Sequence, residues 1–276
     1  MPIIRYDAQR ATTGLSAADL GLEFVSVRRL EFSQACSRQV QTDRTEACLV
    51  VLRGSVAYTC VLKGGARQTG VADTMDILLL PPQSEAAVEA ADSIVMHYQA
   101  PSELGADFQH VRFAAVDSDP ATHHVYGKRE SGSERHVWNL IDTWQRCSRL
   151  MLGICEGKAG GWTAWPPHEH SAEREEVYVY FDMQNSFGIQ CVYEDLFEPG
   201  ATAIVRDGNV VSIPRVYRPN TGCPAGRIKY VYCMAAKTPG FRDFMDLRIQ
   251  PAPSCNKHLI RRDPCPSFSR PDKLLT

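Results

Sequence analysis

Two histidines and a glutamate near the middle of the chain have the spacing of metal ligands. His168 and His170 are one residue apart, and Glu176 begins the alternating run EVYVYF. In an extended chain, side chains two residues apart share a face, so the two histidines converge and Glu176 leads a face continued by Tyr178. Two imidazoles and one carboxylate suit Zn, Mn, Fe or Ni and leave positions open for water or substrate. The sequence therefore predicts a catalytic divalent metal site at His168, His170 and Glu176.

The same segment has a simpler interpretation as a solvated, charged turn. Four charged residues surround the histidine pair, namely Glu169, Glu173, Arg174 and Glu175. The run that follows directly has the alternation of a half-buried strand, which favours a placed site over a loose surface loop. We therefore prefer the metal site, with Glu175 as the fallback carboxylate.

Composition places the chain among ordinary globular proteins. It has 276 residues, 44% hydrophobic and 22% charged, which suffices for one large or two moderate domains. The net charge of -2 and the pI near 6.4 show no basic excess, which argues against nucleic acid as a partner. No apolar run reaches the roughly 20 residues of a membrane span, and the first residues lack the apolar stretch of a signal peptide. We therefore expect a cytoplasmic protein with no membrane partner.

Short runs typical of β-strands dominate the chain, and they are bounded by Gly, Pro, Asn and Asp. The segment SAADLG offers one short helix. The polar stretch 116–136, VDSDPATHHVYGKRESGSERH, is typical of a linker between two β blocks. The sequence therefore predicts an all-β protein with two domains, residues 1–118 and residues 119–276, the second including a proline-rich C-terminal tail.

The two predicted domains share an internal likeness. LVVLRGSVAYTCV followed by MDILLLPPQSEAAVEA parallels VYVYFDMQNSFGIQCV followed by GNVVSIPRVYRPNTG. A duplicated β-barrel explains this pattern better than one long sandwich. The first copy has no His-x-His pair and carries Gln83, Ser84 and Glu85 after its two prolines. We therefore expect the first barrel to be structural and the second to carry the chemistry.

Several motifs of the second half resemble a known family. GGWTAWPPHEH, EEVYVYF, FGIQCVYE, DGNVVSIPRVYRPN and YVYCMAA, with ERHVWNLI before them and FRDFMDL after them, are similar to the bicupin uronate isomerases of inositol and pectin catabolism. The resemblance implies two stacked cupin barrels. It also implies a divalent metal held in the second barrel by three histidines and a glutamate, and aldose-ketose interconversion of a uronate-type sugar. His168, His170 and Glu176 match the first three ligands.

Arg218 departs from the family pattern, because it stands where the resemblance implies the fourth ligand, a histidine before a proline. Guanidinium stays protonated and has no lone pair to offer a metal. Three outcomes follow. Arg218 binds a substrate anion beside a three-ligand metal, or it pairs with Glu175 or Glu176 in a site that has lost its metal. In the third outcome a distant histidine completes the shell, and the candidates are His97, His110, His123, His124, His136 and His258. We expect it to bind a substrate anion at the rim of the pocket.

Other residues near the predicted site have less certain roles. Tyr178 is expected either to line the barrel or to take part in proton transfer, and Gln190 to face the cavity and bind hydroxyl groups. Arg135 and His136 are expected to be solvated. The predicted catalytic set is Glu176, Tyr178, Gln190 and Arg218, and Glu176 is also a predicted metal ligand.

Three functions remain open at this point. The first is a metal-dependent isomerase of a uronate-type sugar or related polyhydroxylated acid, which needs no organic cofactor because the chain has no GxGxxG or P-loop spacing. The second is a non-haem iron oxygenase with a site of two histidines and one glutamate. The third is a non-catalytic sugar-binding bicupin. The expected partners are a small anionic sugar derivative and further copies of the chain in a homo-oligomer.

Overall fold

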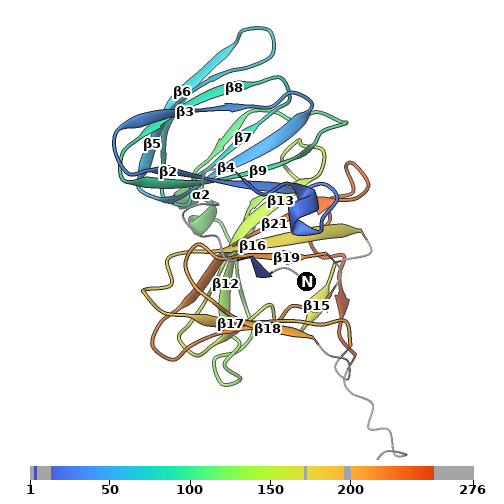
Figure 1. Cartoon of the computed structure of the whole chain (residues 1–276). Coiled ribbons are helices and arrows are strands. Elements are labelled where there is room, and N and C mark those ends of the chain that lie inside the picture. The colour runs from blue at the N-terminus through green and yellow to red at the C-terminus, as the bar shows by residue number, and fades with distance from the viewer. Residues whose placement is uncertain (1–2, 5–13, 171–172, 196–199, 215, 252–276) are drawn as a thin grey trace, which may run out of the picture.

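The computed structural model describes residues 3–4, 14–170, 173–195, 200–214 and 216–251. Within them the chain forms two β-rich halves, each made of facing sheets, and two short helices (Figure 1). The two halves share one extended hydrophobic core. This confirms the all-β class. The predicted C-terminal tail after residue 251 lies outside the described residues.

The first half contains a five-stranded sheet of order β10-β7-β4-β9-β2 and a four-stranded sheet of order β3-β8-β5-β6. Its interior is aliphatic, with Leu49, Val51, Leu78 and Val95 among the buried side chains. The strands are β2 (Ser26–Phe32), β3 (Cys36–Gln41), β4 (Thr45–Arg53), β5 (Ser55–Val61), β6 (Arg67–Asp73), β7 (Ile77–Leu80), β8 (Glu85–Ala90), β9 (Ser93–Pro101) and β10 (Gln109–Val111).

The second half is built on a seven-stranded sheet of order β1-β19-β16-β21-β13-β12-β11, faced by a four-stranded sheet of order β14-β20-β17-β18. β15 and β22 form a separate two-stranded ribbon. The strands are β1 (Ile3–Ile4), β11 (His123–Tyr126), β12 (Arg135–Ile141), β13 (Leu150–Gly157), β14 (Trp162–Thr163), β15 (His168–Glu169), β16 (Arg174–Tyr180), β17 (Gly188–Val192), β18 (Ala201–Val205), β19 (Val210–Ile213), β20 (Asn220–Gly222), β21 (Ile228–Ala236) and β22 (Arg248–Ile249).

The five-stranded and seven-stranded sheets pack against each other. One core cluster contains Cys48 and Val50 of β4 together with Val177 and Val179 of β16. The alternate residues of the same strands point into the interior of their own half, as Tyr178 does in β16. Both strands are therefore buried on both faces, which explains why they have long apolar runs. This packing leaves the inner face of the seven-stranded sheet to line a cavity.

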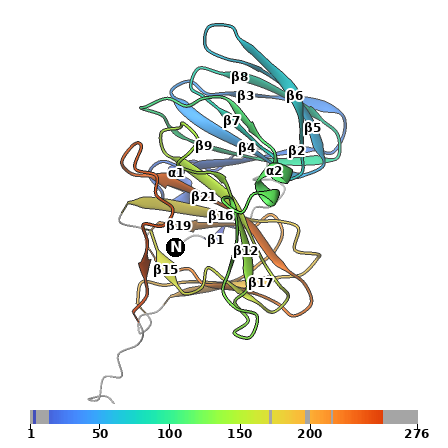
Figure 2. The ribbon, with the colours of Figure 1, turned by 180° about the vertical axis from the view of Figure 1, so that it is seen from behind.

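Two short helices connect these sheets. α1 (Ala17–Leu20) confirms the helix predicted at SAADLG, and its start is fixed by a capping box between Ser16 and Asp19. α2 (Phe113–Ser118) lies between the two halves, as Figure 2 also shows. No helix in the described part of the chain has the length and apolar character to cross a membrane.

The polar stretch 116–136 is more ordered than predicted. It contains β11, which pairs with β12 and is an edge strand among the described residues. The β-forming residues Val125 and Tyr126 explain why a strand forms inside a polar segment. β1 pairs with β19, so the described residues near the N-terminus join the sheet of the second half. We keep residues 118 and 119 as the proposed domain boundary.

Candidate functional site

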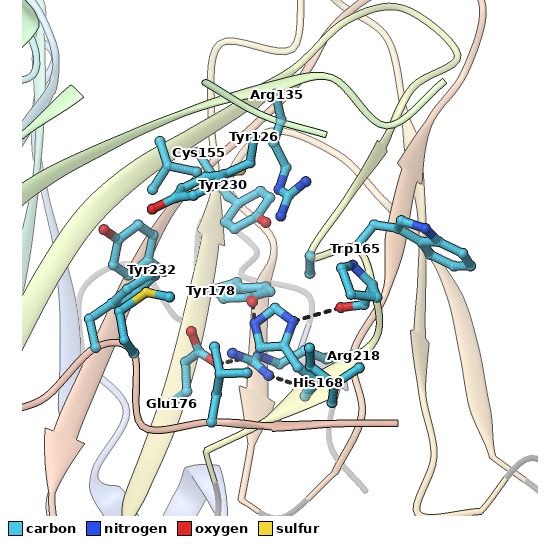
Figure 3. A pocket seen from close by; sticks show the side chains of 17 residues that line it. Tyr126, Arg135, Cys155, Trp165, His168, Glu176, Tyr178, Arg218, Tyr230 and Tyr232 are labelled. Atoms are coloured by element: carbon cyan, nitrogen blue, oxygen red, sulfur yellow. Dashed lines mark hydrogen bonds and ion pairs between the residues drawn. The ribbon is translucent and has the colours of Figure 1, made fainter. Parts of the chain in front are cut away.

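A cavity of about 210 Å³ lies against the inner face of the seven-stranded sheet (Figure 3). β12 contributes Arg135, β16 contributes Glu176 and Tyr178, and β21 contributes Tyr230 and Tyr232. The loop around Trp165 and the segment 244–249 complete the lining, which is mostly apolar. A small, largely apolar cavity with a few convergent polar groups is the usual form of a small-molecule site.

The tyrosines of the cavity come from two neighbouring strands in register. β16 and β21 are antiparallel, and Tyr178 lies opposite Tyr232 while Tyr180 lies opposite Tyr230. The ring centroids of Tyr178 and Tyr230 are 4.3 Å apart. The prediction named only Tyr178 for the site. The Tyr-x-Tyr spacing of KYVYCMAA was the signal that would have placed Tyr230 and Tyr232 on the same face.

Arg218 and Glu176 form a buried ion pair at one end of the cavity. Arg218 is 1% exposed and Glu176 is 3% exposed, and the Arg218 Nε atom contacts Oε2 of Glu176. The same Nε–H donates to the Tyr178 hydroxyl over 2.9 Å, and Nη1 of Arg218 donates to the backbone carbonyl of His168 over 2.6 Å. The guanidinium therefore ties together the carboxylate, the tyrosine and the histidine strand. Of the outcomes open from the sequence, this is the one in which Arg218 pairs with Glu176.

The electrostatics of this pair favour a charged arginine and a carboxyl group of unusual basicity. Burial raises the pKa of Glu176, and the neighbouring Arg218 opposes part of that rise. The charge of Glu176 raises the pKa of Arg218 against the effect of burial, so the guanidinium stays protonated. Burial also raises the pKa of Tyr178, which keeps its hydroxyl neutral and able to donate a hydrogen bond.

The two histidines predicted as ligands lie next to each other, with ring centroids 5.3 Å apart. Nδ1 of His168 donates to the carbonyl of Pro166 over 2.8 Å, and Nδ1 of His170 donates to the carbonyl of Asp246 over 3.2 Å. Because a carbonyl only accepts, each Nε2 atom keeps its lone pair. Burial, together with the charge of Arg218, lowers the pKa of His168 to about 3 and lowers that of His170 as well. Both rings are therefore neutral.

These residues do not fit a divalent metal as a set. The imidazoles have the orientation of metal ligands, and the Nε2 atom of His170 is buried without a hydrogen-bond partner. The third donor, however, is engaged by a cation. A unit charge about 4 Å from a divalent ion costs roughly 8 kcal/mol at an effective dielectric constant of about 20. Among the described residues, no three His, Cys, Asp or Glu side chains form a cluster that could hold a metal ion.

The distant histidines do not complete a metal shell in the part of the chain that is described. Only His168 lines the cavity, and the candidates that do not are His97, His110, His123, His124 and His136. His258, the remaining candidate, lies outside the described residues. His123 and His136 are hydrogen-bonded to each other over 2.9 Å on the outer edge of the sheet.

The charged residues beside the histidine pair are not a solvated turn. Arg174 is 1% exposed and Glu175 is 4% exposed. The Glu175 carboxylate accepts the backbone N–H groups of Glu23, Phe24 and Val25 over 2.7 to 2.8 Å. Glu175 therefore points to the other face of β16 from Glu176, as the strand alternation requires, and it has no contact with Arg218.

Gln190 lies outside the cavity lining and is fully buried. Its Nε2 atom donates to the carbonyls of Cys191 and Arg218 over 2.8 and 2.9 Å. Its Oε1 atom accepts from the Tyr180 hydroxyl and from Nδ2 of Asn220. These bonds satisfy the side chain within the protein. Gln190 therefore fixes the loop that carries Arg218, rather than facing a hydroxyl group of a substrate.

Arg135 was expected to be solvated, and that prediction is wrong. It is 9% exposed and lines the cavity. The alternation of β12 explains its placement, because Arg135 and Val137 share the face that looks into the second half. The signal in the sequence was a charged residue two positions before Val137, on the face that strand alternation turns inward.

Comparisons with known proteins agree with this architecture. The model of the KduI/IolB family matches residues 4–250. A 5-deoxy-glucuronate isomerase from Geobacillus kaustophilus is 24% identical over 226 residues, which cover 78% of this chain and 81% of that protein. A 4-deoxy-L-threo-5-hexosulose-uronate ketol-isomerase from Opitutus terrae is 32% identical over 104 residues, covering 37% of this chain and 36% of that protein.

Solved structures confirm the cupin fold. An IolB-like protein from Salmonella typhimurium superposes with a TM-score of 0.75 and 21% identity, covering 86% of this chain and 92% of that one. Oxalate decarboxylase from Bacillus subtilis, described with Mn(II) centres, superposes with a TM-score of 0.56 and 10% identity, covering 80% of this chain and 71% of that one. The resemblance inferred from the motifs is confirmed, because the family match spans nearly all described residues. The chain belongs to the KduI/IolB family.

Proposed function

We propose that this protein is a sugar isomerase that interconverts the aldose and ketose forms of a uronate-type sugar in the cavity of its second half. Membership of the KduI/IolB family and the isomerase names of the curated relatives support the reaction class. The observation that carries the proposal is the buried Arg218–Glu176 pair beside the Tyr178 hydroxyl at one end of the cavity. It combines a base with donors for a developing negative charge.

The reaction moves one proton between adjacent carbons of an open-chain sugar. A base removes the proton from the hydroxyl-bearing carbon next to the carbonyl, and the electron pair forms an enediolate with charge on the former carbonyl oxygen. The same group then returns a proton to the former carbonyl carbon, while a proton passes between the two oxygens. Glu176 is suited to carry the carbon proton, because burial raises its pKa toward the working range of such a base.

The negative charge that develops on oxygen needs fixed donors nearby. Arg218 and Tyr178 offer N–H and O–H groups in a site from which most water is excluded, where such donors stabilise charge most strongly. His168 faces the cavity with an unprotonated Nε2 atom that can accept a hydrogen bond from a substrate hydroxyl group. We propose that Arg218 supplies the positive charge that a divalent cation would otherwise provide.

A second candidate function is non-catalytic binding of a sugar acid. It is favoured by the same ion pair, because a carboxylate held by a guanidinium is a weaker base than a free one. An oxygenase with two histidines and one glutamate is less well supported, because Arg218 engages the glutamate that would complete its iron site. A cytoplasmic location and assembly into a homo-oligomer remain predictions within this proposal.

Proton exchange in deuterated water tests the proposal. Open-chain uronates incubated with the wild type should show deuterium incorporation at the carbon next to the carbonyl, together with the isomerised product, by NMR. Glu176→Gln should slow both by about 10²- to 10⁴-fold, the usual contribution of a general acid-base group. Gln83→Glu, an isosteric change in the first half, serves as a control and should leave the rate unchanged. Binding without exchange across a panel of uronates would favour the non-catalytic function.

A further inference from the structure

Arg135 is a buried cation without an acidic partner. Its guanidinium lies over the ring of Tyr126, 5.5 Å from the ring centroid, and its Nη1 atom donates to the carbonyl of Ser133 over 3.3 Å. No carboxylate in the described part of the chain lies within ion-pair distance of it. Figure 3 shows the guanidinium pointing into the cavity, with Glu176 and Arg218 at the other end.

Three other buried arginines, Arg149, Arg218 and Arg242, are satisfied within the protein. Arg149 pairs with Glu103 and donates to two backbone carbonyls, and Arg218 pairs with Glu176. Arg242 has no carboxylate, but it donates to the carbonyls of Asp142, Gln145 and Leu150. Arg135 has neither arrangement, and most of its donors face the cavity. A buried charge without a counter-charge is costly, which indicates that a ligand supplies the missing anion.

The charges of the cavity lead to the same conclusion. Among the lining residues, Arg135 and Arg218 each carry a charge of +1 and Glu176 carries −1, so with His168 neutral the cavity has a formal charge of +1. The Arg218–Glu176 pair is internally balanced. The uncompensated charge therefore belongs to Arg135. A ligand with one negative charge would neutralise the cavity.

We propose that Arg135 binds the carboxylate of the sugar acid and so selects anionic substrates. The planar guanidinium can form two parallel hydrogen bonds with a carboxylate, and the Tyr126 ring lies on one side of it with its centroid 5.5 Å away. The carbonyl end of the substrate then lies toward Glu176 and Arg218. This inference rests on the proposed function, since that function names the sugar acid. It assigns to Arg135 the anion-binding role that the sequence suggested for Arg218.

Equilibrium binding to matched ligands tests this role. Glucuronate and glucuronamide differ at one group, where the charged carboxylate is replaced by a neutral amide of similar size, so titration calorimetry or NMR measures the preference for the anion. The wild type should prefer glucuronate by about tenfold or more, as expected for a charge-assisted bond. Arg135→Gln should abolish the preference, and Arg135→Lys should retain part of it because the charge remains without the fork. Arg146→Gln, at an exposed arginine outside the cavity, should retain all of it.

The outcomes separate this inference from the proposed function. A wild type without preference for glucuronate, including one that binds neither ligand, would overturn the role of Arg135, as would an unchanged preference in Arg135→Gln. Tighter binding of glucose 6-phosphate than of glucuronate would also overturn it, because the anion would then be a phosphate. Deuterium exchange is measured on the same samples. A preference that depends on Arg135 without any exchange would support the binding role and contradict the isomerase.

Discussion

The two halves of the molecule share a scaffold, and they differ at the residues that face their interiors. In the first half, Glu46 on β4 accepts the backbone N–H groups of Ser148, Arg149 and Leu150 over 2.6 to 2.9 Å. In the second half, Glu175 on β16 accepts three consecutive N–H groups, those of residues 23–25. Each glutamate is the second residue of its strand, and each binds backbone at or just before the start of a strand of the opposite half, β13 for Glu46 and β2 for Glu175.

The residue after each glutamate marks the divergence between the halves. Ala47 in β4 occupies the place of Glu176 in β16, because each lies one residue beyond the shared glutamate and faces its own interior. Two residues further along the face, Leu49 corresponds to Tyr178. The comparison shows that both halves carry the glutamate that joins them, whereas the buried Arg218–Glu176 ion pair faces the interior of the second half. That the first half is structural stays a prediction.

The largest effect is expected from removing either joining glutamate. Glu46→Ala and Glu175→Ala each leave three backbone donors of the opposite half without their acceptor, and each should lower the free energy of unfolding by roughly 3 to 6 kcal/mol. Urea denaturation measures both losses. Glu89→Ala, at an exposed position of β8, should change stability by less than about 0.5 kcal/mol. A large loss for one glutamate only would show that the halves are not equivalent in this respect.

The ion pair that exists only in the second half should contribute next. Arg218→Met leaves Glu176 buried beside no cation, and it should lower the free energy of unfolding by about 3 to 5 kcal/mol. Adding Glu176→Leu should restore much of that loss, because the unpaired charge is then removed. Denaturation of the single and double variants measures the coupling. Additive losses would contradict a direct pairing of the two side chains.

A smaller, pH-dependent effect is expected in the first half. His97, which lies opposite Leu49 as Tyr232 lies opposite Tyr178, has its pKa lowered to about 4 by burial and by the charge of Arg28. In the unfolded chain this histidine binds a proton near pH 6.5, whereas in the folded protein it does so only near pH 4. The free energy of unfolding therefore has its full value above pH 6.5 and falls as the pH drops from 6.5 to about 4. A shift of this size corresponds to about 3 kcal/mol.

Comparison with His97→Phe isolates this contribution, because the variant replaces the imidazole with an apolar ring that cannot titrate. Between pH 7 and pH 4.5 the stability of the wild type should fall further than that of the variant, as followed by urea denaturation. Parallel pH profiles would show that His97 is already solvated in the folded protein.

Sequence reasoning predicted the fold because the relevant signals are local. Strand alternation placed Glu175 and Glu176 on opposite faces, and the repeated motifs indicated two barrels. The partners of these residues could not be predicted from local patterns, because the N–H groups bound by Glu175 lie about 150 residues away along the chain. The role of Arg135 was missed for a similar reason. Only the closure of β21 and the segment 244–249 around it shows that its charge faces a cavity.

The metal content of the protein tests the central claim most directly, which is that Arg218 takes the place of a divalent cation. Wild type, Arg218→His, and the double variant His168→Ala, His170→Ala are purified without chelators, offered Zn, Mn, Fe and Ni in turn, desalted, and measured by elemental analysis. We expect the wild type to retain far less than one metal ion per chain, similar to the double variant, and Arg218→His to approach one. A stoichiometric metal in the wild type that the double variant loses would contradict the claim and restore the site first predicted from the sequence.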